Sequence, residues 1–262
     1  MKKQKIILFQ KGRKRRVYDP YKVYVAKSKY HSVVPLKIYQ TWFSKELPEH
    51  IKKSVEKLKT ENPEFEYFLF DDNDCREFIS SHFEENVVDA FDTLIPGAYK
   101  ADLWRYCVLY VNGGIYLDIK YNCVNGFKLI GLTEQEWFVK DFESSNGGVY
   151  NALMVSKPKN PFYKQFIDKV VENVKNREYG ENALCPTGPL MLKPFLTNYT
   201  YSLFHRTHNQ MFFIFNKTLD IDILAVDIHY REEQRVYHNG KNHYTRLWAE
   251  KQIYKETEEI KN

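Results

Sequence analysis

Short aromatic or β-branched runs alternate with longer segments of helical periodicity along most of this chain. Residues 36–40 form the first apolar run, and residues 49–59 follow with apolar side chains at helical spacing. Residues 65–70 are rich in aromatic side chains and end at an Asp-Asp-Asn turn, which predicts a second strand. Strand, helix and strand in this order are typical of a parallel sheet with helical crossovers. The pattern therefore predicts an α/β fold.

A stronger helix is predicted over residues 99–112. Its apolar side chains form one stripe, and Gly113-Gly114 supplies a left-handed C-terminal stop. Asp102 and Arg105 lie three residues apart, off the centre of this stripe. Their spacing alone indicates no more than an ion pair between neighbouring turns, which is worth roughly a few tenths of a kcal/mol.

Residues 115–121 follow the glycines directly and predict one continuous strand. Its period of two places Asp118 and Lys120 on the same side. A carboxylate at the carboxyl end of a strand in an open α/β sheet lies where such folds bind ligands. A hard oxygen ligand there suits Mg²⁺ or Mn²⁺ bridging a substrate diphosphate, although a single aspartate does not by itself predict a metal site.

Weaker patterns complete the chain and contain neither a repeat nor a flexible linker. They predict helices over 73–92, 162–174 and 246–259, and strands over 136–142, 149–156, 211–215 and 221–226. A single domain is therefore expected over residues 33–262, preceded by a basic N-terminal arm over residues 1–32.

The arm carries most of the positive charge. Residues 1–32 contain 11 Lys or Arg and a single acid, Asp19, whereas the whole chain of 262 residues has a formal charge of +5. Such an arm can contact anionic lipid or nucleic acid, or it can simply keep the chain solvated. No apolar run reaches the roughly 20 residues that span a bilayer. With no recognisable secretory segment either, a cytoplasmic location is expected, with association to a membrane through the arm.

Several common catalytic patterns are absent from the sequence. It contains no GxxxxGK[ST] or GxGxxG loop, no GxSxG elbow and no HExxH motif. Hydrophobic residues at 43% and charged residues at 28% exclude a disordered or membrane-embedded chain. The cysteines form no CxxC pair and are expected to be buried thiols: Cys75, Cys107, Cys123 and Cys185.

Residues 101–106 read ADLWRY, and residues 113–118 read GGIYLD. Together these strings resemble the signature of glycosyltransferase family 32, the family with a DXD sugar-binding motif. Further likenesses follow in the family's order: residues 34–42, 62–72, 151–154 and 187–189, and His243 with Trp248. The family includes yeast mannosyltransferases and many microbial capsule transferases, and its catalytic core is similar to that of the large clostridial glucosylating toxins.

The resemblance implies a Rossmann-like fold of the GT-A type and a retaining hexosyltransferase that uses a UDP- or GDP-sugar. It implies a glycan, lipid-linked or protein acceptor, as in polysaccharide biosynthesis, and attack on the same face of the sugar with the leaving phosphate taking the acceptor's proton. The catalytic residues that it implies are Asp102, Arg105 and Asp118. The donor-binding residues that it implies are Tyr39, Gln40, Thr41, Trp42, Tyr116, Lys120, Gly188, His243 and Trp248.

Lys120 departs from the family's pattern, because it stands where the second aspartate of the motif is expected. Either Asp118, with water and His243 or Asn242, still binds Mn²⁺ or Mg²⁺ in a weakened site, or Lys120 replaces the metal as a fixed cation beside the leaving diphosphate. An active enzyme with the weakened metal site is the alternative that we expect. The expected partners are the nucleotide-sugar donor, a glycan or lipid-linked acceptor and an anionic membrane, and not nucleic acid. The alternative functions are a sugar-nucleotide-binding protein with little turnover, and a module whose basic arm binds a membrane or nucleic acid.

Overall fold

A computed structural model of the chain describes residues 23–141, 147–207, 209–215, 220–227, 229–238 and 243–256. Most of the basic arm lies outside the described residues, so the boundary between an arm over 1–32 and a domain over 33–262 stays a prediction. Among the described helices, none has both the length and the apolar character that crossing a membrane requires.

Strands and helices alternate through the first half of the chain, and antiparallel strands dominate the second half. The strands are β1 (Lys37–Thr41), β2 (Glu66–Phe70), β3 (Gly114–Leu117), β4 (Tyr121–Cys123), β5 (Val139–Asp141), β6 (Leu153–Ser156), β7 (Leu203–Arg206), β8 (Met211–Phe215) and β9 (Asp220–Val226). The α-helices are α1 (Glu49–Glu61), α2 (Asp72–His82), α3 (Glu85–Thr93), α4 (Gly97–Asn112), α5 (Pro161–Lys175), α6 (Pro189–Leu192), α7 (Tyr230–His238) and α8 (Tyr244–Ala249). Short 3₁₀ helices are η1 (Leu129–Leu132) and η2 (Lys193–Leu196).

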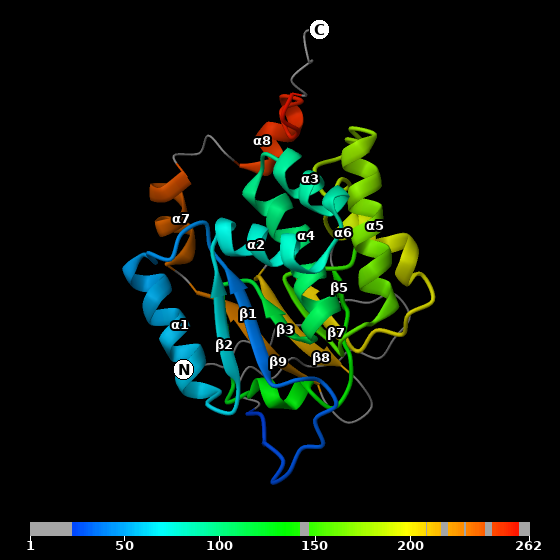
Figure 1. Cartoon of the computed structure of the whole chain (residues 1–262). Helices are drawn as coiled ribbons and strands as arrows, with labels where there is room; N and C mark the ends of the chain where they lie inside the picture. Colours follow the sequence, from blue (N-terminus) through cyan, green and yellow to red (C-terminus); the bar gives the residue numbers. More distant parts are fainter. Residues whose placement is uncertain are drawn as a thin grey trace, which may run out of the picture.

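The described strands form two mixed sheets (Figure 1). One has the strand order β2-β1-β3-β6, in which β1 pairs in parallel with β2 and β3 while β6 runs antiparallel to β3. The other has the order β4-β9-β8-β7-β5, in which β5 and β7 are parallel and the remaining pairs antiparallel. The parallel pairing predicted from the opening strand, helix and strand is thus confirmed for β1, β2 and β3. Among the other described strand pairs only β5 and β7 are parallel.

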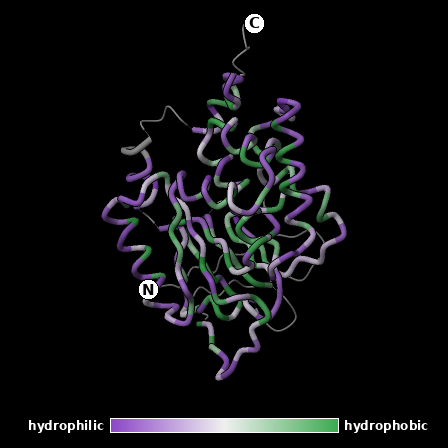
Figure 2. Tube along the Cα trace, in the orientation of Figure 1, coloured by the Kyte–Doolittle hydropathy of each residue, from purple (hydrophilic) through white to green (hydrophobic). Residues whose placement is uncertain are grey.

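The first sheet lies between a layer of helices and the second sheet. On one face Tyr39 and Tyr116 join the core formed with α2, α3, α4 and α5. On the other face Ile38 and Ile115 join the core shared with β7, β8 and β9. Figure 2 shows hydrophobic residues concentrated in the central strands and hydrophilic residues on the outer helices. Because side chains alternate along a strand, the next position on the helical side after Tyr116 is Asp118.

Local sequence patterns predicted the first elements close to their observed bounds. The observed counterparts of the predicted segments are β1, α1, β2, α4, α5, β8 and β9. The buried thiols are also confirmed for Cys75, Cys107 and Cys123, whereas Cys185 is only partly buried. Each of these segments carries its own apolar periodicity, which explains why they can be found without tertiary information.

Two predicted helices are wrong in their extent. The helix expected over 73–92 is two helices, because the backbone is extended at Phe83 and Glu84, between α2 and α3. The closing helix expected over 246–259 is the shorter α8, and residues beyond 256 lie outside the described residues. The single apolar stripe on α4 is also wrong, since Trp104 is fully buried on another side of the helix.

The continuous strand expected over 115–121 is interrupted at its polar centre. β3 ends at Leu117, and β4, which begins at Tyr121, belongs to the other sheet. Between them a turn closes with a hydrogen bond of 3.1 Å from the backbone N of Tyr121 to the carbonyl of Asp118. The chain therefore changes sheets at the segment that carries Asp118 and Lys120.

Gly113 fixes the sharp passage from α4 into β3. Its φ of 63° and ψ of −165° lie in a region that is essentially restricted to glycine. A Cβ atom at this position would lie 2.7 Å from the ring Cδ of Pro158. The close approach holds the end of α4 against the segment that follows β6.

Replacing Gly113 by alanine is expected to lower the free energy of unfolding by at least about 1–3 kcal/mol, the cost of holding a non-glycine residue in this conformation. Urea unfolding followed by circular dichroism measures the change. Gly97→Ala is the matched control, because its added Cβ meets nothing within 4 Å at the start of the same helix. Equal unfolding midpoints for the two variants would show that the passage is not tightly constrained.

Candidate functional site

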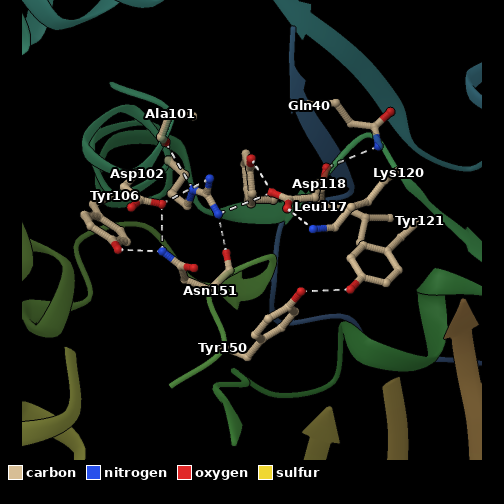
Figure 3. A network of polar contacts seen from close by, with 12 residues as sticks. Gln40, Ala101, Asp102, Tyr106, Leu117, Asp118, Lys120, Tyr121, Tyr150 and Asn151 are labelled. Carbon is tan, nitrogen blue, oxygen red and sulfur yellow. Dashed lines mark hydrogen bonds and ion pairs between the residues drawn. The ribbon is translucent and has the colours of Figure 1, made fainter. Parts of the chain in front are cut away.

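A polar network joins α4 to the carboxyl end of β3 (Figure 3). Tyr116 and Asp118 both point toward α4, and the Tyr116 hydroxyl donates a hydrogen bond of 2.8 Å to Oδ1 of Asp118. The guanidinium carbon of Arg105 lies 4.2 Å from the centre of the Tyr116 ring. An arginine stacked on an aromatic face and held by carboxylates keeps one orientation. The network therefore fixes a cation beside a carboxylate at the end of the strand.

Arg105 is the centre of this network. Its Nη2 lies 3.2 Å from Oδ1 of Asp102, and its Nη1 lies 3.3 Å from Oδ1 of Asp118. Nη1 also donates a hydrogen bond of 2.7 Å to the carbonyl of Asn151. Only 6% of the Arg105 side chain is exposed. Burial alone would lower the pKa of Arg105, but Tyr116, Asp102 and Asp118 outweigh this effect and raise it.

Asp102 ties α4 to two distant loops. Its Oδ1 accepts a hydrogen bond of 2.8 Å from Nδ2 of Asn151, and its Oδ2 accepts one of 2.8 Å from Oγ1 of Thr187. The Tyr106 hydroxyl continues the network by donating to the carbonyl of Thr187 at 2.8 Å. Burial raises the pKa of Asp102, although Arg105, Thr187 and Asn151 oppose the rise. The Asp102 carboxylate thus holds the loop of Asn151 and the loop of Thr187 against α4.

Asp118 and Lys120 form the part of the cluster that solvent reaches. Nζ of Lys120 lies 3.2 Å from Oδ2 of Asp118, and the two side chains are 21% and 23% exposed. Burial alone would raise the pKa of Asp118, but Lys120 and Arg105 outweigh it and hold that pKa below its ordinary value. Asp118 in turn raises the pKa of Lys120 against the effect of burial. Both groups are therefore charged at neutral pH.

Tyrosine side chains surround the cluster from later parts of the chain. The hydroxyls of Tyr150 and Tyr121 lie 3.0 Å apart, and Tyr150 extends the network toward the second sheet (Figure 3). Burial raises the pKa of Tyr230 to about 12, and it lies within electrostatic range of Lys120 and Asp118. Tyr244, whose pKa is raised by burial and then by Asp102, also lies within electrostatic range of Lys120. These tyrosines were missed by the sequence analysis.

The structure brings together many of the predicted site residues, and it places others in the core. Asp102, Arg105, Tyr116, Asp118 and Lys120 form one connected cluster. Gly188 borders it, because a Cβ atom there would lie 3.3 Å from Oδ2 of Asp102. The roles predicted for these residues in binding and catalysis remain predictions.

Residues 39–42, which are predicted to bind the donor, are mostly engaged in packing and in hydrogen bonds to the backbone. Tyr39 is 1% exposed and stacks on Phe68 with ring centres 5.2 Å apart. Gln40 donates a hydrogen bond of 3.2 Å from Nε2 to the carbonyl of Leu117, the residue before Asp118. Thr41 donates one of 2.9 Å to the carbonyl of Phe70.

Trp42 packs with Ile51, Val55 and Ile119 in a small apolar cluster beside α1. Ile119 lies between Asp118 and Lys120 in the chain, so Trp42 packs against the turn that carries these two charged residues. The contact of residues 39–42 with a donor stays a prediction.

His243 precedes α8 as its N-cap, and Trp248 lies within the helix. Nδ1 of His243 accepts a hydrogen bond of 3.4 Å from the backbone N of Thr245 and so caps the helix. Nε1 of Trp248 donates one of 2.7 Å to the carbonyl of Tyr179. Tyr244, between them in the chain, lies within electrostatic range of Asp102 and Lys120. The predicted role of His243 and Trp248 in binding the donor stays a prediction. Asn242 lies outside the described residues.

The residues around Asp118 do not fit the predicted Mn²⁺ or Mg²⁺ site. Such ions favour several oxygen ligands in octahedral geometry, but within the described ranges no group of three or more His, Cys, Asp and Glu could hold a metal. Asp118 is already paired with Arg105 and Lys120. Two unit charges 4 Å apart interact by about 4 kcal/mol at an effective dielectric constant of 20. The repulsion between a divalent ion and the Lys120 ammonium at that distance would be twice as large, which disfavours a metal beside Asp118.

Sequence reasoning noticed Asn151 and Thr187 as markers of the resemblance but gave them no role. Their contacts with Asp102 and Arg105 explain why they accompany the ADLWRY string. Tyr106 lies in the helix predicted over residues 99–112 and was counted with its apolar stripe. Its hydroxyl nevertheless donates a hydrogen bond to the carbonyl of Thr187. No local pattern separates a tyrosine that packs from one that also donates a buried hydrogen bond.

Comparisons with known proteins identify the region around this cluster. Residues 48–137 match the family model described as "Glycosyltransferase sugar-binding region containing DXD motif". The match contains α4, β3 and the Asp-Ile-Lys turn, and therefore Asp102, Arg105, Asp118 and Lys120.

Similar sequences come from fungi and a virus. Inositol phosphoceramide mannosyltransferase 2 of Schizosaccharomyces pombe is 31% identical over 55% of this chain and 40% of its own length. Mannosyl phosphorylinositol ceramide synthase SUR1 of Saccharomyces cerevisiae is 30% identical over 61% of this chain and 41% of its own. Uncharacterized glycosyltransferase L373 of Acanthamoeba polyphaga mimivirus is 26% identical over 64% of this chain and 66% of its own. The chain thus spans about two fifths of the length of the first two relatives.

A solved structure supports the fold. The PaToxG glycosyltransferase superposes with a TM-score of 0.52 at 18% sequence identity, over 62% of this chain and 69% of that chain. The predicted α/β fold of the GT-A type is therefore confirmed. The family match over residues 48–137 confirms the resemblance to the glycosyltransferases with a DXD sugar-binding region, over the part of the chain that carries Asp102, Arg105 and Asp118.

Proposed function

We propose that this chain is a hexosyltransferase that moves a sugar from a nucleoside diphosphate donor to an acceptor hydroxyl, with retention at the anomeric carbon. The observation that carries the proposal is the connected cluster of Asp102, Arg105 and Asp118, inside the region that matches the family model. The names of its relatives, which are mannosyltransferases, favour mannose as the sugar and GDP-mannose as a donor to test first.

The charges of the cluster suit the chemistry of a leaving diphosphate. When the bond between the anomeric carbon and the phosphate oxygen breaks, its electron pair stays on the diphosphate. Arg105 and Lys120 are cations held in place by Asp118, so they need not reorganise as this negative charge grows. Asp102 and Asp118 can accept hydrogen bonds from sugar hydroxyls.

Retention is proposed to proceed by attack on the face that the diphosphate leaves. The acceptor oxygen forms its bond to the anomeric carbon on that face, and the departing phosphate oxygen takes the acceptor's proton. This route uses the leaving group as the base, so no side chain has to form a covalent bond with the sugar. It rests on the analogy with the family.

A lipid-linked acceptor is the class that we favour. The names of two relatives contain inositol phosphoceramide and mannosyl phosphorylinositol ceramide, and a ceramide is a lipid. The basic residues of the arm, 1–32, would bring the chain to an anionic membrane surface where such an acceptor lies. A cytoplasmic location with peripheral membrane contact is part of this proposal, and a soluble glycan acceptor remains its alternative.

A panel of sugar nucleotides tests the proposal. GDP-mannose, UDP-glucose and UDP-galactose are each added to the full chain, and thermal unfolding is followed with UMP and GMP as controls. A donor at about 100 times its dissociation constant adds about 2.7 kcal/mol to the free energy of unfolding. At about 2–4 °C per kcal/mol for a chain of this size, the midpoint should rise by about 5–10 °C.

Release of the nucleoside diphosphate in the presence of a lipid or glycan acceptor then measures turnover. A donor that raises the midpoint and is consumed supports a transferase. A donor that raises the midpoint and is never consumed would instead support a sugar-nucleotide-binding protein. If no sugar nucleotide shifts the midpoint, the proposed function is wrong.

A further inference from the structure

Lys120 and Arg105 lie beside the two carboxylate oxygens of Asp118. Its Nζ lies 3.2 Å from Oδ2 of Asp118, while Oδ1 of the same carboxylate lies 3.3 Å from Nη1 of Arg105. Each oxygen of Asp118 thus already has a cation beside it. A metal ion bound through Asp118 would have to displace one of these partners or lie against it.

The formal charges of the cluster explain what the lysine replaces. Asp102, Arg105, Asp118 and Lys120 together carry no net charge. The same cluster with aspartate at position 120 would be negative by two charges, which one divalent cation would neutralise. The substitution of lysine for the second aspartate of the motif therefore supplies the same charge as the ion, without the ion.

The surroundings hold this ammonium in the site. The Asp118 carboxylate forms an ion pair with the Lys120 ammonium, and an opposite charge this close favours the charged form of the lysine. Its Nζ lies 5.3 Å from the centre of the Tyr121 ring, which also favours a cation. The side chain is nevertheless 21% exposed, so a ligand entering beside Asp118 can reach it.

We propose that Lys120 takes the place of the divalent cation, and that this chain binds the diphosphate of its donor without a metal. The inference rests on the proposed function, since it concerns the same donor. During transfer the bond between the anomeric carbon and the phosphate oxygen breaks, its electron pair stays on the diphosphate, and Lys120 and Arg105 pair with the charge that results. The acceptor oxygen forms the new bond, and its proton passes to the departing phosphate.

Calorimetric titration of the full chain with GDP and with UDP, in EDTA and in Mn²⁺, tests this inference. The wild type is expected to bind one of the two nucleotides with dissociation constants that agree within about threefold in the two buffers. A tenfold difference would correspond to about 1.4 kcal/mol of binding free energy from the metal. Affinity at least tenfold higher in Mn²⁺ than in EDTA would overturn the metal-free site and still support the proposed function. Absence of binding in both buffers would contradict the proposed function itself.

The variant Lys120→Asp restores the aspartate and provides a sharper comparison. In EDTA it should bind the nucleotide at least tenfold more weakly than the wild type, and Mn²⁺ should recover the loss. Mn²⁺ alone should raise its thermal unfolding midpoint and leave that of the wild type unchanged, a readout that needs no turnover. If Mn²⁺ fails to stabilise a folded Lys120→Asp protein or to restore its nucleotide binding, the equivalence of lysine and metal is refuted.

Lys53→Asp is the matched control for the change in charge. Lys53 lies on the exposed side of α1, where its side chain is 67% exposed and pairs with Glu49 one helical turn away. This variant alters the net charge of the chain by the same amount but leaves the cluster intact. It should bind the nucleotide like the wild type in both buffers, and an equal loss in both variants would show that the effect is one of overall charge.

Discussion

Replacing Arg105 by alanine should lower the free energy of unfolding by about 3–5 kcal/mol, the range measured when one partner of a buried ion pair is removed. The guanidinium is 6% exposed and stands between the carboxylates of Asp102 and Asp118. Without it two buried negative charges would remain close together, and the carbonyl of Asn151 would lose its donor. Urea unfolding of the purified variant measures the loss.

The matched control for this experiment is Arg76→Ala. Arg76 also pairs with an aspartate, Asp92, at 2.7 Å, but its side chain is 50% exposed. An exposed pair contributes about 0–1 kcal/mol, so this variant should unfold close to the wild type. Arg105→Lys keeps the positive charge but loses the planar guanidinium. Its free energy of unfolding should lie between those of Arg105→Ala and Arg76→Ala. If Arg105→Ala unfolds together with Arg76→Ala, the cluster is not a compensated buried network.

Asp118→Asn should reduce sugar transfer by about 10²- to 10³-fold, the loss typical of removing one preorganised group that stabilises transition-state charge. The Asp118 carboxylate holds Lys120 and Arg105 at 3.2 and 3.3 Å. An amide of the same shape offers no charge and leaves both cations less firmly oriented. The fall should appear mainly in kcat, because orientation matters most when charge develops on the leaving group.

The control variant Asp92→Asn removes an exposed carboxylate and should leave transfer unchanged. Wild-type transfer by Asp118→Asn would remove Asp118 from the site. Because Lys120 and Arg105 hold the pKa of Asp118 below its ordinary value, its ionisation stabilises the folded protein. That contribution is complete above the pKa of the unfolded chain, near 4, and is lost as pH falls through the folded value. Asp118→Asn should therefore lose less stability than the wild type between neutral pH and acid.

The residues of the site could be found from the sequence because they lie in two short segments that strongly resemble the signature of a known family. The hydrogen bonds that join these residues to the rest of the chain could not be predicted. Arg105 bonds to the carbonyl of Asn151, 46 residues away, and Asp102 to Thr187, 85 residues away. Neither loop has a periodicity that points to these contacts.

The same limit explains the errors in the fold. The strings around β1, α1 and β2 carry their own apolar periodicity and were predicted well. The strand over 115–121 was predicted as continuous because its residues all favour strands locally. Its division depends on β4, which pairs with β9 about a hundred residues later in the chain. Tertiary pairing overrode the local preference.

The change of sheet at residues 118–120 has an evolutionary consequence. The backbone of this turn is held by the carbonyls of Asp118 and Lys120, which accept from Tyr121 and Asp227, and by the amide of Asp118, which donates to Ala152. None of these bonds uses a side chain. A substitution at position 120 can therefore exchange lysine for aspartate while the backbone of this turn is kept, so that related chains can differ at this position without a change of fold.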